Sequence, residues 1–259
     1  MRAIVTGAAR GIGRAICLRL ARDAAMAGGV KLVVTDQRIE ELNALVEDIK
    51  ALGGEAIAVP GDISDPALPS VIVGASEVFG GLDALVSNAG FSIPGPLATY
   101  ELDNWDKVFA VHVRAPWLLA KAAYPALKKS RGAIVVTASI SGTHAQAPLG
   151  AYSPSKAAAL MLVRQLANEW GPDGIRVNAF SPGLTITPGT AAAYASPTAF
   201  EQRKARVPLR RMAEADDMAG VVAFLLSKDA AYVHGVDLLV DGGLSNTVMG
   251  ALDMTGWKQ

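Results

Sequence analysis

Short apolar runs alternate with longer helical segments along almost the whole chain, and this alternation constrains the fold more than any other feature. Seven apolar runs have the length and composition of buried strands. They cover residues 3–5, 30–35, 55–59, 82–87, 133–138, 174–180 and 236–240. Strands that alternate with helices form a parallel sheet with helices on both faces. The sequence therefore predicts a doubly wound α/β fold with seven parallel strands.

Two longer segments lie between these strands. Residues 103–129 have a helical composition, and Pro116 and Pro125 should bend or divide this region because proline lacks the N–H of an interior helical residue. Residues 184–208 show little periodicity. A loop longer than about 12–15 residues is uncommon in a compact domain unless it has a function, so this segment is predicted to be a lid over the substrate.

Size and charge limit the classes of function. With 259 residues, 51% of them hydrophobic, and no linker or repeat, residues 1–259 are predicted to form a single domain. Lys and Arg together number 24, as do Asp and Glu, so we expect no nucleic-acid partner and no membrane partner. No apolar run reaches the roughly 18 residues of a membrane span, and no signal-like segment follows Met1. Cys17 is the only cysteine, so no internal disulfide forms and a cytoplasmic location is expected.

A glycine-rich turn follows directly on the first strand. Its sequence, Thr6-Gly7-Ala8-Ala9-Arg10-Gly11-Ile12-Gly13, leads into a helical pattern. Glycines let the backbone approach a pyrophosphate, and the free N–H groups of the following helix favour negative charge. An ordinary glycine-rich turn is the alternative. The position after an N-terminal strand favours a dinucleotide site of the Rossmann type.

Asp36 ends the second strand, about 20 residues beyond these glycines. A carboxylate there can accept hydrogen bonds from the adenosine ribose and would repel a 2′-phosphate, which favours NAD over NADP. Arg10 and Arg38 argue for NADP, since either can neutralise that phosphate. The alternative for Asp36 is a cap of the next helix.

Tyr152 and Lys156 are the candidate chemical centre. They lie four residues apart, and an Ala- and Leu-rich segment follows, so both side chains should share one face of a helix that starts near Tyr152. A phenol has a pKa of about 10, which a nearby ammonium is expected to lower. Such a tyrosine can exchange a proton with an alcohol or a carbonyl. The spacing is common by chance, so its weight depends on the surrounding motifs.

Together with further motifs in the same order, these features resemble the short-chain dehydrogenase/reductase family over essentially the whole chain. The further motifs are Asn88-Ala89-Gly90, Ser139 thirteen positions before Tyr152, Pro182-Gly183 and Asp241-Gly242-Gly243. The resemblance implies hydride transfer between a nicotinamide and an alcohol or carbonyl carbon. It also implies that Tyr152 is the general acid/base, that Lys156 lowers its pKa and holds the nicotinamide ribose, and that Ser139 polarises the substrate oxygen.

The resemblance further implies where ligands and partner subunits bind. Asp62, Ile63 and Asn88 would border the adenine and its ribose, and Thr187 would reach the carboxamide or the diphosphate. The implied cofactor-binding residues are Gly7, Arg10, Gly11, Ile12, Gly13, Asp36, Asp62, Ile63, Asn88, Ala89, Gly90, Tyr152, Lys156, Pro182, Gly183, Thr185 and Thr187. The candidate substrate-pocket residues are Ser141, His144, Leu184 and Tyr194. A homotetramer is expected, with a dimer as the next alternative.

Two positions depart from the family pattern. His112, in the phrase Val111-His112-Val113-Arg114, stands where the family usually has an Asn that anchors a water supplying protons to the Lys. His112 can serve this proton relay itself, weaken it, or be a core histidine without such a role. Thr185 replaces a branched apolar residue, which is a mild change. None of the three histidines has metal-ligand spacing, so no metal site is expected.

Three functions from two classes remain open. The first is an NAD-dependent alcohol dehydrogenase or ketone reductase that acts on a small secondary alcohol or its ketone. The second is an NADP-dependent 3-oxoacyl-thioester reductase whose acidic carrier protein docks on the basic run of Arg203, Lys204, Arg206, Arg210 and Arg211. A solvated, ion-paired segment is the other explanation for that run. The third is a cofactor-binding scaffold or regulator without turnover.

Overall fold

A computed structural model describes residues 1–25 and 28–247, and it confirms the predicted parallel sheet. Seven strands form one sheet in the order β3-β2-β1-β4-β5-β6-β9, and every neighbouring pair is parallel. The strands are β1 (Arg2–Thr6), β2 (Lys31–Thr35), β3 (Glu55–Ala58), β4 (Ala84–Ser87), β5 (Ala133–Thr137), β6 (Arg176–Pro182) and β9 (Asp237–Val240). Each boundary lies within two residues of the predicted one.

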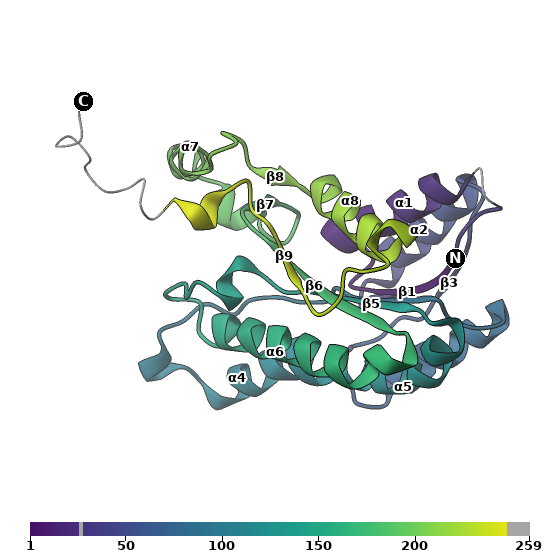
Figure 1. The fold of residues 1–259 in the computed structure, drawn as a ribbon. Helices are drawn as coiled ribbons and strands as arrows, with labels where there is room; N and C mark the ends of the chain where they lie inside the picture. The colour runs from purple at the N-terminus through teal and green to yellow at the C-terminus, as the bar shows by residue number, and fades with distance from the viewer. Residues whose placement is uncertain (26–27, 248–259) are drawn as a thin grey trace, which may run out of the picture.

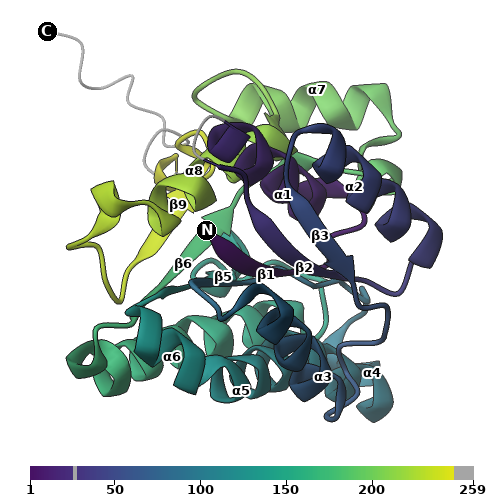
Figure 2. The same ribbon diagram turned by 90° about the vertical axis from the view of Figure 1, so that its right-hand side faces the viewer.

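Helices cover both faces of the sheet, as Figures 1 and 2 show. One layer contains α1 (Gly11–Ala24), α2 (Ile39–Ala51) and α8 (Ala215–Leu226). The other contains α3 (Leu68–Ala75), α4 (Leu102–Phe109), α5 (Ala115–Ser130) and α6 (Tyr152–Trp170). Successive strand residues point to opposite faces, so Val34 packs in the core with Cys17 of α1, whereas Val33 packs in the other core with Leu119 of α5. Because helices cover both faces of the sheet, residues on both sides of each strand are apolar, and the strands appear in the sequence as continuous apolar runs without alternation.

The strand order reverses at β1, which lies between β2 and β4. In open parallel sheets the helices on opposite faces leave a crevice at the carboxyl ends of the strands beside such a switch point. Thr6, Asp36, Asn88 and Ser139 all stand at or just beyond these strand ends. The fold therefore gathers the sequence motifs at one edge of the sheet.

The helical region predicted at residues 103–129 divides into two helices at a different place from the one expected. A π-helical segment, η4 (Ala110–Arg114), separates α4 from α5, and Pro116 occupies the first turn of α5. Pro125 lies inside α5 without ending it. Proline is tolerated in a first turn, where no N–H partner is lost, so Pro116 marks a helix start rather than a bend.

The prediction of an irregular loop at residues 184–208 is wrong in its secondary structure. This segment contains the short strand β7 (Thr185–Ile186), the 3-10 turn η7 (Ala191–Tyr194) and the helix α7 (Pro197–Arg206). The Ser196 hydroxyl accepts the N–H of Ala199 as an N-cap, and Pro197 starts the helix. Because α7 is mostly polar and has no buried residue, it shows no apolar stripe in the sequence.

Candidate active site

Glycines shape the turn between β1 and α1 into a close-fitting cradle. Gly7 and Gly11 have φ angles of 63° and 57°, which residues with a Cβ rarely adopt. A Cβ on Gly13 would lie 2.1 Å from the carbonyl oxygen of Gly7, so only glycine lets α1 begin this close to the strand. Arg10 is half-buried at the N-cap of α1, and Ile12 packs against the adjoining core. The turn thus brings the free N–H groups of α1 to the crevice.

Asp36 holds this turn from the side. Its carboxylate accepts hydrogen bonds from the N–H groups of Ala9 (3.3 Å) and Arg38 (3.1 Å), and the Arg38 guanidinium lies 3.4 Å away. The Asp36 side chain is only 8% exposed, so few of its acceptor positions face solvent. The N–H of Gly61 donates to the Asp36 carbonyl (3.0 Å), which brings Asp62-Ile63 to the same edge of the sheet.

Two strand-end hydroxyls order the Asn88-Ala89-Gly90 turn. The Thr6 hydroxyl oxygen accepts the N–H groups of Asn88 and Ala89, both at 3.0 Å. The Thr137 hydroxyl donates to the side-chain oxygen of Asn88 (3.0 Å), and the Asn88 amide donates to the Thr6 carbonyl (3.1 Å). Thr137 was not singled out from the sequence, and Thr6 was named only as the first residue of the glycine-rich turn. Both threonines end parallel strands, and Ser139 likewise follows the end of β5. That position at a strand end was the sequence signal that could have identified them as site residues.

Ser139, Tyr152 and Lys156 meet beyond the carboxyl end of β5. Tyr152 begins α6, as predicted, and Lys156 lies one turn later with its Nζ 5.7 Å from the centre of the Tyr152 ring. The Lys156 ammonium donates to the carbonyl oxygen of Thr137 (2.8 Å). The Ser139 oxygen accepts the N–H of Ser141 (3.1 Å), which leaves its own hydrogen for another acceptor.

Burial governs the protonation of these groups. It raises the pKa of Tyr152, and the hydrogen bond with the Ser139 hydroxyl opposes that rise. The net shift is therefore opposite to the lowering expected from Lys156, whose ammonium is directed at the Thr137 carbonyl. Burial also lowers the pKa of Lys156 to about 8. A charged Lys156 and an ionised Tyr152 are both costly here unless further charge enters the site.

His112 lies beneath Tyr152, in the π-helical segment, and is 2% exposed. Its ring meets the Tyr152 ring edge-on, with the ring centres 5.5 Å apart. Its Nε2 accepts the N–H of Phe91 (3.1 Å), and its Nδ1 lies 2.8 Å from the Ser155 hydroxyl oxygen. Burial lowers the pKa of His112 to about 2, and the Lys156 ammonium acts in the same direction. His112 is therefore neutral at physiological pH.

The segment after β6 lies against the glycine cradle. A Cβ on Gly11 would lie 3.3 Å from Cβ of Thr187, so these backbones approach closely. Gly183 is required beside β9, because a Cβ there would lie 2.7 Å from Cα of Asp241. Pro182 and Thr185 are buried on either side, and the Thr185 hydroxyl donates to the Gly183 carbonyl (3.2 Å). The structure thus brings the residues predicted to contact the two ends of the cofactor to one crevice.

These features fit a dinucleotide. The glycine cradle cannot accommodate a side chain at Gly13, and the N–H groups of α1 suit a diphosphate. The hydroxyl of Thr35, at the end of β2, is buried and has no hydrogen-bond partner within the described residues. Acceptor and donor groups at the strand ends suit ribose hydroxyls and an amide. The residues present therefore match the chemistry of a nicotinamide dinucleotide.

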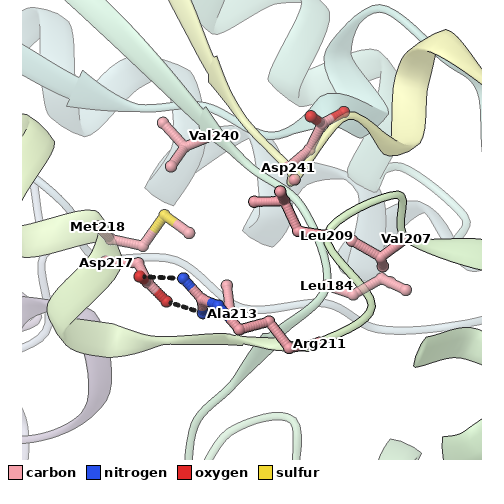
Figure 3. A pocket seen from close by; sticks show the side chains of 10 residues that line it. Leu184, Val207, Leu209, Arg211, Ala213, Asp217, Met218, Val240 and Asp241 are labelled. Atoms are coloured by element: carbon pink, nitrogen blue, oxygen red, sulfur yellow. Dashed lines mark hydrogen bonds and ion pairs between the residues drawn. The ribbon is translucent and has the colours of Figure 1, made fainter. Parts of the chain in front are cut away.

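The base of the predicted lid is tied to the rest of the molecule (Figure 3). Strand β7 pairs with β8 (Ala213–Glu214), and Arg211 makes a two-bond ion pair with Asp217 of α8 (2.6 and 2.7 Å). Asp217 also accepts the N–H of Glu214 (2.8 Å) in a capping box. Leu184, predicted to line the substrate pocket, lines a cavity of about 90 Å³ at this hinge. We call β7, β8 and the Arg211–Asp217 pair the lid hinge.

The other candidate pocket residues lie around Ser139. The Ser141 hydroxyl is buried and donates to the side-chain oxygen of Gln146 (3.1 Å), which orients the Gln146 amide. Gln146 was not singled out from the sequence. His144 is exposed and contacts the Thr143 hydroxyl (2.9 Å). Tyr194, in the predicted lid, is half-buried; burial raises its pKa, Arg203 opposes that rise, and the nearby Tyr152 phenol adds to it. The lid thus brings a second phenol toward the site.

The predicted basic run is largely paired within the lid. Arg203 donates to the Ala193 carbonyl, Arg210 donates to the Ala205 carbonyl, and Arg211 pairs with Asp217. Lys204 pairs with Glu201 (2.9 Å). These contacts match the ion-paired explanation for the run better than an open docking surface.

Residues 1–25 and 28–247 contain neither a metal-binding cluster nor a membrane-spanning helix. No group of three or more His, Cys, Asp and Glu side chains is placed to hold a metal ion in this part of the chain. Among the same residues, no helix has the length and apolar character of a membrane span.

His234 joins β6 to α6, because its Nδ1 accepts the N–H of Val177 (3.2 Å) and its Nε2 lies 2.9 Å from the Ala167 carbonyl oxygen.

Comparison with known proteins finds relatives that match almost the whole chain. The family model described as enoyl-(acyl carrier protein) reductase matches residues 7–245. A 2,5-dichloro-2,5-cyclohexadiene-1,4-diol dehydrogenase of Sphingobium indicum is 36% identical over 94% of this chain and 95% of its own length. The crystal structure of levodione reductase superposes with a TM-score of 0.88 at 32% identity, covering 95% of this chain and 97% of that one. A short-chain dehydrogenase from Burkholderia cenocepacia in complex with NADP has a TM-score of 0.85 at 37% identity, covering 94% and 97%.

Proposed function

Because this chain is a member of the short-chain dehydrogenase/reductase family, whose nicotinamide-dependent oxidoreductases act on CH–OH groups, we propose that it exchanges a hydride between NAD and a small secondary alcohol or its ketone. The observation that carries the proposal is the meeting of Ser139, Tyr152 and Lys156 beside the glycine cradle. A buried phenol next to a hydroxyl donor suits proton exchange with an alcohol oxygen.

The proposed roles follow from the contacts. In the oxidative direction the ionised Tyr152 takes the proton of the substrate hydroxyl, and the free hydroxyl hydrogen of Ser139 donates to the substrate oxygen as charge develops on it. Lys156, held by Thr137, supplies positive charge one helical turn away and would bind the nicotinamide ribose. A bound nicotinamide would supply the hydride acceptor, and the positive charge of its oxidised form would offset part of the cost that burial places on the Tyr152 phenolate.

NAD is the proposed cofactor on the strength of Asp36. A carboxylate that is 8% exposed at the end of β2 would repel a 2′-phosphate at short range. Arg38 is already held by this carboxylate, which weakens it as a phosphate ligand. The NADP complex of the Burkholderia relative supports the opposite choice, so the cofactor is the first quantity to measure.

The substrate proposal rests on the groups that line the site. Gln146 and Tyr194 supply an amide and a phenol near Ser139, while much of the surrounding lid is alanine. We therefore infer a small, modestly polar substrate that carries a second oxygen. The ring diol named for the Sphingobium relative has this character.

An NADP-dependent 3-oxoacyl-thioester reductase is the second candidate. The acyl carrier in the family model's description and the NADP-bound relative favour it. The pairing of Arg203, Lys204, Arg210 and Arg211 within the chain argues against a carrier-docking surface. Turnover of an acetoacetyl thioester with NADPH, faster than that of any free ketone, would move this candidate to first place.

The deciding experiment measures reduction of NAD⁺ and NADP⁺ by absorbance over simple secondary alcohols and cyclic diols. We expect NAD⁺-linked turnover in the wild type and a loss of at least 100-fold in Tyr152→Phe, because general acid–base catalysis contributes about 10²–10⁴-fold. Tyr124→Phe, a distant phenol paired with Asp173, is the matched control and should keep full activity. Cofactor binding without turnover of any substrate would instead support a scaffold or regulator.

We also propose that the chain assembles as a homotetramer in the cytoplasm, with a dimer as the alternative. Large apolar side chains are exposed on α4, α5 and α6, at Leu102 (70%), Trp117 (43%) and Met161 (58%). Exposed apolar groups of this size favour burial against another surface. Light scattering coupled to gel filtration should give about four times the 26.8 kDa chain mass, and Trp117→Glu should reduce it. A monomeric wild type would overturn the assembly proposal.

A further inference from the structure

We propose that His112 is a positioning residue, a permanently neutral imidazole that fixes the ring and the backbone of Tyr152 and transfers no proton during turnover. Its catalytic consequence rests on the proposed function of Tyr152. The structural claim, which concerns one tautomer of one ring, can be tested without any substrate.

The hydrogen bonds assign the tautomer. A backbone N–H can only donate, so the Nε2 of His112 must accept from Phe91 (3.1 Å) and carries no hydrogen. The remaining hydrogen lies on Nδ1, which donates to the Ser155 oxygen (2.8 Å). Ser155 in turn donates its own hydrogen to the carbonyl oxygen of Tyr152 (2.7 Å). Each polar atom in this chain has one consistent role, and Ser155 is itself fully buried.

The same ring supports Tyr152 in two ways. The hydrogen-bonded chain through Ser155 holds the Tyr152 backbone at the first turn of α6. The edge-on contact, with ring centres 5.5 Å apart and an interplanar angle of 84°, holds the aromatic ring itself. Rotation of the Tyr152 side chain is therefore restricted from below, while its hydroxyl faces Ser139.

The π-helical segment places the ring under this site. The N–H of Ala115 bonds to the carbonyl of Ala110, which inserts one extra residue into the turn that carries His112. A Cβ on Gly90 would lie 3.1 Å from the His112 Nε2, so the turn at residues 88–90 lies close against the ring and a larger residue there would crowd it. The His112 imidazole thus connects η4, the turn at residues 88–90 and the start of α6.

Protonation of the ring would break this arrangement. An imidazolium would direct a second N–H at the donor of Phe91 and would add a positive charge next to Lys156. The titratable side chains that face the ring are Tyr152 and Lys156, both on α6. Neither offers the carboxylate that would stabilise a cation. A proton relay through His112 requires this charged form, or a tautomer exchange that would break both hydrogen bonds.

The first test is ¹⁵N NMR of histidine-labelled protein without substrate. We expect one histidine to remain neutral and protonated at Nδ1 from about pH 6 to pH 9, and its signal to be absent from His112→Asn. A His112 signal that titrates in this range, or that is protonated at Nε2, would overturn the assignment. This result does not depend on turnover, so it separates failure of the inference from failure of the proposed function.

The second test compares kinetics. His112→Phe should lower kcat by about 10–100-fold with little change in KM, because a misplaced catalytic group costs on this order. The loss should be the same factor at every pH, since a neutral ring transfers no proton. His112→Asn, whose amide can donate to Ser155, should recover most of the rate. An unchanged kcat in His112→Phe, or a loss confined to one limb of the pH profile, would overturn the inference.

His234→Asn is the matched control. His234 also uses both ring nitrogens in hydrogen bonds, to Val177 and Ala167, but it does so toward the opposite end of α6 from Tyr152. If His112 were only structural, the two asparagine variants and His112→Phe would lower the melting temperature without separating kcat from KM. We expect His234→Asn to keep the wild-type kcat.

Discussion

At the scale of single residues, the carboxylate of Asp36 both braces the glycine-rich turn and holds Arg38. Removing it in Asp36→Ala should release Arg38 toward a 2′-phosphate and end the repulsion of that group. We expect the ratio of kcat/KM for NADP⁺ over NAD⁺ to rise at least tenfold, about 1.4 kcal/mol. Absorbance assays with NADP⁺ and with NAD⁺ give this ratio for the wild type and for Asp36→Ala, and so check the prediction.

Glu41→Ala is the control for that variant. Glu41 is the other carboxylate near Arg38, with an oxygen 3.8 Å from its guanidinium, but it belongs to the exposed face of α2. Its removal should leave the cofactor ratio unchanged. An unchanged ratio in Asp36→Ala itself would mean that the carboxylate does not select the cofactor.

The positions of the main site residues were predictable from the sequence, whereas their protonation and hydrogen-bond partners were not. Strand-end motifs predicted the placement of Ser139, Asn88 and Asp36, because parallel strands bring their carboxyl ends to one edge. The direction of the Tyr152 pKa shift was not predictable, since it depends on burial by segments distant in the chain. The hydrogen-bond partners of His112 likewise come from two other elements.

At the scale of elements, the Arg211–Asp217 pair and the capping box make the lid hinge a testable unit. Asp217→Ala removes the ion pair and one of the two hydrogen bonds of the capping box, and we expect it to destabilise the hinge by about 1–2 kcal/mol. Trypsin should then cut the predicted lid, near Arg203 and Lys204, about 5–30 times faster because local opening becomes more frequent. The cleavage rate at constant protease concentration measures this.

Asp216→Ala is the matched control for the hinge. Asp216 lies in the same first turn of α8 and carries the same charge, but it is exposed and outside the ion pair. It should be cut at close to the wild-type rate. Equal rates for the two variants would show that charge at the start of α8, rather than the hinge contacts, controls the lid.

Elements with apolar faces were predicted well, and elements without them were not. Five of the seven strands and α6 bury apolar residues, and the apolar residues of β3 and β9 pack against the core partly buried; these residues produce the apolar pattern of the sequence. The helix α7 buries no residue, so its sequence carries only the N-cap Ser196 and Pro197 as signals. The π-helical turn adds one residue to a helix, which shifts the apolar pattern rather than ending it.

At the scale of the whole molecule, the buried ammonium of Lys156 lowers the free energy of unfolding. Burial lowers the pKa of Lys156 to about 8, below its ordinary value, so between these pH values the unfolded chain binds more protons at this position than the folded chain. The contribution of Lys156 to stability therefore rises as pH rises from about 8 to about 10.5, and its cost is greatest below pH 8.

Lys156→Met tests this cost. The variant should lose activity but gain about 1–2 kcal/mol in the free energy of unfolding at pH 7, after about 1 kcal/mol is lost with the hydrogen bond to Thr137. The difference from wild type should shrink as pH approaches about 10, as measured by urea unfolding at several pH values. Lys129→Met, on an exposed helix end, is the control and should show no such trend. A destabilised Lys156→Met at pH 7 would contradict the prediction.

Cys17 gives the molecule a built-in chemical reporter. The thiol has 0% exposure, and burial raises its pKa, so an alkylating reagent reaches no reactive thiolate while α1 stays packed on the sheet. A cysteine introduced at Ala192, in the exposed part of the lid, would then be the one site that a fluorophore labels in the native protein. The rate of Cys17 alkylation would in turn measure how often the core opens. One chain would therefore report lid motion through the fluorophore and unfolding through Cys17.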